Sequence, residues 1–222
     1  MRLPEDDASL RRMGTAALAG VLVFVLVCSA VQFLRADLDW MRTPLSFYLI
    51  DAYGGWVRAA YGLLSVALGL IGVGYYRALT PQARSGVARA LFVLAGLALA
   101  VTASADTQRP RQPLTTTGTV HAIAAPLAFL FVTMGMLLQS WCLRGDTQWR
   151  ARFAPAFILA VACFAALWGH ALWRSAPRGL TQKAVILLIL AWLALAAFWL
   201  RRLTPPDREP VALSGKVPAG DG

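Results

Sequence analysis

The residues best suited to chemistry lie between Ala103 and His121, in the segment ASADTQRPRQPLTTTGTVH. Asp106 stands at the end of one apolar run, and His121 stands at the start of the next. A carboxylate and an imidazole can transfer protons or bind a metal ion. In a chain this apolar, we expect the function to centre on these two side chains, which the ends of two helices would position.

The first interpretation of this segment is a structural clamp. Asp106 lies at a helix C-terminus, where the helix dipole disfavours a carboxylate, so it requires a cationic partner. Arg109 and Arg111 are the nearest cations in sequence, and His121 is a further candidate partner. His121 itself would bond a loop carbonyl, or the carbonyl that Pro126 leaves without an N–H donor.

Two cofactor-dependent interpretations stay open beside the clamp. Asp106, His121 and His170 form a set that can bind zinc and leave a position for water, which predicts an outward-facing hydrolase. His121 and His170, the two histidines of the chain, could instead be axial ligands of a haem in an electron carrier. Our leading expectation is that there is no cofactor, with zinc and haem as the alternatives.

Composition places the chain in a membrane. Hydrophobic residues make up 58% of the 222 residues and charged residues only 14%, below the roughly 25% of soluble domains. The net charge of +10 comes from cations that flank apolar runs, and no basic run with interleaved aromatic residues lies outside them. We therefore expect membrane lipid as a partner and no nucleic acid. A partner membrane protein or a second copy of the chain is a further expectation.

The fold class that we predict is all-α, with six transmembrane helices in one bundle. Each apolar run approaches the roughly 20 residues that a spanning helix needs. Residues 1–14 would be a cytoplasmic N-terminal tail, 15–202 the membrane domain and 203–222 a disordered cytoplasmic tail. The predicted spans are Thr15–Leu34, Ala59–Tyr76, Gly86–Ala105, Gly118–Cys142, Phe153–Trp173 and Ala184–Leu200.

Three local patterns predict how these helices are arranged. The aromatic-rich segment 35–57 is expected to lie partly along the membrane surface. Small residues in the second span would let a neighbouring helix approach closely. The threonine triplet 115–117 is expected to cap the fourth helix. The small residues are Gly62, Ser65, Gly69 and Gly72.

The distribution of lysine and arginine predicts the orientation. Thirteen of these cations fall on the side of both termini and eight on the other side, which favours cytoplasmic termini. The protein would then be a multi-pass protein of the bacterial cytoplasmic (inner) membrane. Asp106, His121 and His170 would face outward.

Short motifs add a family resemblance. A Leu-Ser-x-Tyr motif and a Tyr-Gly-x-Trp element occupy the first long loop, an Asp closes the third span, and a Gly-x-x-His opens the fourth. A Gly-Leu-x-x-Lys element precedes the last span, where the family has arginine in place of lysine. The matching residues are Leu45, Ser46, Tyr48, Tyr53, Gly54, Trp56, Asp106, Gly118, His121, Gly179, Leu180 and Lys183. With these motifs the chain resembles the bacterial and archaeal integral-membrane family called domain of unknown function 998.

The resemblance implies a six-span fold and locates the site, but it implies no activity. We expect a non-enzymatic protein with an outward-facing polar site at Asp106 and His121. Lipid or small-ligand binding, transport, or assembly of an envelope complex are the functions that fit. The ligand or proton site candidates are Asp106, His121, Ser46, Tyr48, Arg109 and Lys183.

Overall fold

The computed structural model describes residues 4–108, 113 and 115–203, and this part of the chain is helical without strands. Six of its helices are long and apolar enough to cross a membrane, which confirms the predicted all-α membrane fold. Two short 3-10 helices, η1 (Leu45–Leu49) and η2 (Arg150–Arg152), lie in the connections. The long helices are α1 (Pro4–Leu34), α2 (Gly54–Ala78), α3 (Gly86–Ser104), α4 (Thr116–Leu143), α5 (Phe153–Leu172) and α6 (Arg178–Arg201).

The first helix extends well beyond its predicted span. It begins at Pro4, whereas the sequence placed the start of the span at Thr15 and a tail before it. Leu10 and Ala17 are buried on the same face as the later Val21, so the packing stripe continues into the polar segment. The predicted disordered tail after residue 203 lies outside the described residues.

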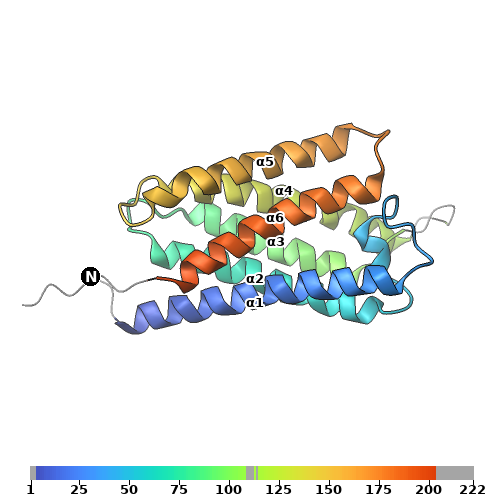
Figure 1. The fold of residues 1–222 in the computed structure, drawn as a ribbon, viewed down its shortest axis with the longest axis horizontal. Helices are drawn as coiled ribbons and strands as arrows, with labels where there is room; N and C mark the ends of the chain where they lie inside the picture. Colours follow the sequence, from blue (N-terminus) through green and yellow to red (C-terminus); the bar gives the residue numbers. More distant parts are fainter. Residues whose placement is uncertain (1–3, 109–112, 114, 204–222) are drawn as a thin grey trace, which may run out of the picture.

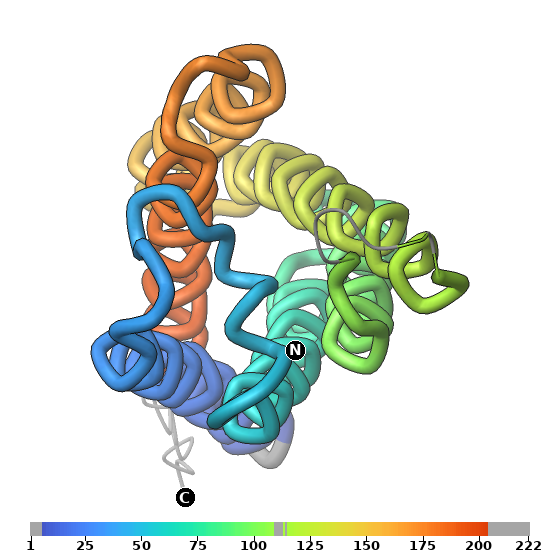
Figure 2. The backbone as a smooth tube through the Cα atoms, turned by 90° about the vertical axis from the view of Figure 1, so that its right-hand side faces the viewer, coloured from blue at the N-terminus to red at the C-terminus, as the bar shows by residue number. Residues whose placement is uncertain are grey.

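The six helices form a closed ring in chain order. Each helix packs against the next one, and α1 also packs against α6, so that the first and last helices close the ring. Figures 1 and 2 show this arrangement along and across the helices, with α5 furthest from α1 and α2. We call the end where α1 begins and α6 ends the terminal end, and the opposite end the capped end.

Large rings fill the half of the bundle nearer the terminal end. Phe92 of α3 stacks on Trp192 of α6 with ring centroids 5.7 Å apart. Tyr75 of α2 meets Trp149 edge-on at 5.0 Å, and both side chains are buried. These aromatic contacts join helices on opposite sides of the ring and leave this half well packed.

Part of the predicted small-residue stripe mediates close helix contact. A methyl group added at Gly72 would lie 2.8 Å from the Cβ of Phe92, and one added at Gly96 would lie 2.6 Å from the Ser65 carbonyl oxygen. Close approach of α2 and α3 therefore requires these glycines. The same test at Gly62 and Gly69 meets no atom within 4 Å, so these two do not contribute.

The connection between α1 and α2 folds over the capped end of the ring. The sequence predicted that this segment lies partly along the membrane surface. In η1 the side chains of Leu45, Tyr48 and Leu49 are buried. Tyr53 and Trp56 remain exposed, as interfacial aromatic residues would be. We call residues 35–53 the cap segment. It packs inward because its apolar side chains find a hydrophobic core between the helix ends.

Candidate functional site

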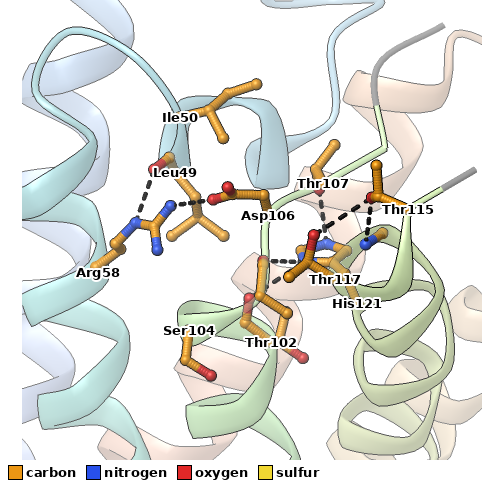
Figure 3. A network of polar contacts seen from close by, with 12 residues as sticks. Leu49, Ile50, Arg58, Thr102, Ser104, Asp106, Thr107, Thr115, Thr117 and His121 are labelled. Carbon is orange, nitrogen blue, oxygen red and sulfur yellow. Dashed lines mark hydrogen bonds and ion pairs between the residues drawn. The ribbon is translucent and has the colours of Figure 1, made fainter. Parts of the chain in front are cut away.

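The connection from α3 to α4 closes around a buried histidine. The His121 side chain lies inward from the first turns of α4 and is only 6% exposed. Its Nδ1 lies 3.1 Å from the Thr102 carbonyl oxygen and 2.9 Å from that of Ala105. Because carbonyl oxygens only accept, Nδ1 carries the hydrogen and donates to both. In the neutral ring Nε2 then accepts from the Thr107 hydroxyl at 2.8 Å (Figure 3).

Asp106 points away from this histidine and pairs with an arginine on another helix. Its Oδ1 accepts from Nη2 of Arg58, near the start of α2 (Figure 3). The same guanidinium donates from Nε to the Leu49 carbonyl at 3.0 Å, so one cation joins α2, the cap segment and the end of α3. The Asp106 side chain is 60% exposed, and screening by water makes the ion pair weak.

The structure places Asp106, His121 and His170 in separate hydrogen-bonded settings. No hydrogen bond joins Asp106 to His121, and His170 bonds Thr181 through Nδ1 at 2.7 Å. Within residues 4–108, 113 and 115–203, no group of three His, Cys, Asp or Glu residues could hold a metal ion. Both ring nitrogens of His121 are hydrogen-bonded to protein groups in this structure. Arg109 and Arg111, two of the predicted partners of Asp106, lie outside the described residues.

Two further cations hold the cap segment by its backbone. Lys183 of α6 donates to the Trp40 carbonyl and, at 3.1 Å, to the Thr43 carbonyl. Arg35, which is 7% exposed, donates to the carbonyls of Ile50 and Ala52 at 3.2 and 3.3 Å. The polar side chains at this end of the bundle thus satisfy loop carbonyls.

Charge pairing and burial fix protonation states in the cap segment. Arg35 donates to both carboxylate oxygens of Asp37 at 2.8 Å, and these hydrogen bonds hold the pKa of the Asp37 carboxyl below its ordinary value. The same bonds raise the pKa of Arg35. Burial raises the pKa of the Tyr48 phenol, so it is neutral at physiological pH. Its hydroxyl has no hydrogen-bond partner in the part of the chain that the structure describes.

Backbone carbonyls of the cap segment also cap the N-terminus of α6. The N–H groups of Gly179 and Leu180, in the first turn, donate to the carbonyls of Arg42 and Met41 at 3.2 and 2.7 Å. A methyl group added at Gly179 would lie 2.5 Å from the Thr43 carbonyl oxygen, so only glycine permits this approach. These bonds supply partners for N–H groups that a helix start leaves free.

An apolar cavity of about 70 Å³ lies beneath the cap segment, inside the ring. Three polar residues line it, Ser46 of η1, Gln182 of α6 and Thr102 of α3, and all three belong to the capped end. The other lining residues are Phe24, Tyr61, Leu64, Leu68, Leu99, Ala125, Ala128, Phe129, Val132, Ile186, Ile189, Leu190 and Leu193. The volume has room for several waters or for the end of a hydrocarbon chain.

Small side chains on α4 explain why the cavity lies in this half of the ring. Ala125 and Ala128 line it, whereas Phe92 and Trp192 fill the equivalent space nearer the terminal end. Gln182 accepts from the Leu45 N–H through Oε1 at 2.8 Å, which leaves its amide N–H groups as donors. The cavity therefore has an apolar body and a polar end beneath the cap segment.

The sequence interpretation missed several residues that build this site. Arg58 and Arg35 were used only as topology signals, and Thr107 and Gln182 carried no assigned role. Gln182 offered a weak signal, because it is an amide at the start of an apolar run. Arg58 offered none, since its partner Asp106 lies 48 positions away.

Comparisons with known proteins identify the family and no activity. The model of a family described as a protein of unknown function, DUF998, matches residues 18–199, which include all residues that line the cavity. No curated protein and no solved structure matches the chain. The match spans most of the 222 residues, from the first helix to the last. The chain is therefore a member of the DUF998 family of multi-pass membrane proteins.

Proposed function

We propose that this protein binds an amphipathic lipid-like molecule. The apolar chain of that molecule would occupy the cavity beneath the cap segment. The observation that carries the proposal is the cavity lining, in which apolar side chains from five helices enclose a space with a polar end. A lining of apolar side chains with a few polar groups is typical of small-molecule sites, and the volume of about 70 Å³ suits the end of a hydrocarbon chain.

The depth of the cavity supports a ligand taken from one leaflet. Its lining on α6 runs from Gln182 to Leu193, which corresponds to about 16 Å at 1.5 Å per residue. That is about half of a hydrocarbon core roughly 30 Å thick. A chain entering beside the cap segment would thus remain at the depth of its own leaflet.

The polar end of the cavity favours an uncharged head group, such as an alcohol, ester or quinone. Its polar lining residues, Ser46, Thr102 and Gln182, carry hydroxyl or amide groups, and among the described residues no charged one lines the cavity. The nearby cation Lys183 is engaged by loop carbonyls. An anionic head group would lose hydration without gaining an ion pair, which is unfavourable.

Orientation follows from the charge bias, which favours both termini in the cytoplasm. With this orientation the cap segment and the mouth of the cavity face outward. The ligand would come from the outer leaflet of the cytoplasmic membrane. Fusion of a reporter that is active only in the cytoplasm to each terminus tests this orientation.

Mass spectrometry of molecules extracted from detergent-purified protein tests the proposal. Wild type is compared with Ala128→Phe, which fills the cavity, and with Ala162→Phe, which adds the same group to the exposed face of α5. We expect one amphipathic species to be depleted about tenfold or more in Ala128→Phe alone, equivalent to 1.4 kcal/mol of binding. Equal amounts in folded samples of all three proteins would contradict lipid binding in the cavity.

A further inference from the structure

A cluster of aromatic and cationic side chains lies at the terminal end, far from the cavity. Arg152, in η2 at the start of α5, places its guanidinium 4.5 Å from the ring centroid of Trp149 and 6.0 Å from that of Trp199. These two rings come from the α4–α5 connection and from α6. The cation is therefore held between the α4–α5 connection and α6 by cation–π contacts.

Two hydrogen-bond donors of this cluster have no acceptor within residues 4–108, 113 and 115–203. The Nη1 of Arg152 is buried and unpaired, as is the Nε1 of Trp149, a residue with no exposed surface. Among the residues that the structure describes, no carboxylate lies within 4 Å of the Arg152 guanidinium. Arg152 is partly buried, and its Nη1 is a buried donor of a cationic group, which favours an anion as its partner.

The one acid of this connection is already engaged. Asp146 is 2% exposed, and its oxygens accept from the backbone N–H groups of Thr80 and Gln148 at 2.9 and 3.0 Å. These bonds tie the connection between α2 and α3 to the connection between α4 and α5. Asp146 thus holds the loops together and does not neutralise Arg152.

More arginines stack on aromatic rings around this cluster. Arg144 lies 4.9 Å from the ring centroid of Trp141, which in turn packs edge-on against Phe153, the neighbour of Arg152. Arg202 lies 4.4 Å from the ring centroid of Phe198. Stacking fixes these guanidinium groups at the ends of spans, at the level of lipid head groups.

We propose that Arg152 and its arginine neighbours bind the phosphate of an anionic phospholipid in the leaflet at the terminal end. Guanidinium groups donate paired hydrogen bonds to phosphate oxygens, and basic pockets between spans suit anionic head groups. A lipid is the favoured source of the phosphate because the exposed apolar face of α5 continues from the site into the membrane. The proposal is independent of the cavity at the capped end.

Thermal unfolding of the full chain in detergent with added lipid tests this site. We expect phosphatidylglycerol to raise the melting temperature of the wild type by roughly 5 °C over the same amount of phosphatidylcholine, because the lipid binds the folded state. Most of this difference should disappear in Arg152→Gln. It should persist in Arg150→Gln, which removes an exposed arginine from the same short helix.

Each outcome decides the assignment. If phosphatidylglycerol and phosphatidylcholine raise the melting temperature of the wild type equally, the proposal is overturned. This comparison needs no variant, so it remains valid even if Arg152→Gln folds poorly. An undiminished response in folded Arg152→Gln overturns it as well. Soluble glycerol phosphate is added in a separate arm, and stabilisation equal to that by phosphatidylglycerol would replace the lipid with a soluble anion.

Discussion

Replacement of His121 by alanine should destabilise the fold while leaving the proposed ligand site intact. The substitution removes the bond that Nδ1 donates to the Thr102 and Ala105 carbonyls and the bond that Nε2 accepts from Thr107. Two net hydrogen bonds contribute about 1 kcal/mol each, and the buried Thr107 hydroxyl left unpaired costs about 1–3 kcal/mol more. The expected loss is therefore about 3–5 kcal/mol in the free energy of unfolding.

Thermal unfolding in detergent, followed by tryptophan fluorescence, measures this loss. At about 2–4 °C per kcal/mol for a chain of this size, the melting temperature should fall by roughly 6–20 °C. Thr107→Val removes only the bond to Nε2 of His121. Its melting temperature should therefore lie between those of the wild type and of His121→Ala. His170→Ala is the matched control, because the His170 ring makes a single hydrogen bond, to Thr181, and its loss should be smaller.

The result that refutes this reasoning is a melting temperature of His121→Ala equal to that of wild type or of His170→Ala. His121 does not line the cavity, so the amount of co-purified ligand per folded protein should stay unchanged. Loss of ligand without loss of stability would instead assign His121 a direct role in binding.

Three further predictions follow from the cap segment. Gly179→Ala should cost about 1–3 kcal/mol by overpacking, measured by thermal unfolding, whereas Gly169→Ala, with no neighbour within 4 Å, should be neutral or slightly stabilising. The bonds from Arg35 lower the pKa of Asp37 in the folded protein, so they stabilise above the ordinary value of 3.8 and are lost as pH falls through the folded pKa. The wild type should then exceed Asp37→Asn in melting temperature at neutral pH and lose that advantage in acid. Tyr53→Asn should raise stability by about 0.5–1 kcal/mol in denaturant unfolding, because Tyr53 has a positive φ of 65°.

The sequence determined the number, limits and membrane character of the helices. Apolar runs of spanning length are a local property, and they located the starts of α3, α4 and α5 within two residues and those of α2 and α6 within six. Thr115 caps α4 through its side chain, as the threonine triplet predicted. The exception was α1, in which the buried Leu10 and Asp7 extend the helix into a segment that is polar in composition.

The tertiary structure alone decided what the polar residues do. Asp106 bonds Arg58, because the first turn of α2 lies beside the end of α3 in the ring. Lys183 bonds carbonyls about 140 positions away, and Ser46 meets Gln182 at the same cavity. Sequence spacing cannot give such contacts, since they depend on which helices are neighbours and on the direction of each side chain. The cavity is likewise a property of packing, formed where alanines of α4 face a ring whose other half is filled by aromatic side chains.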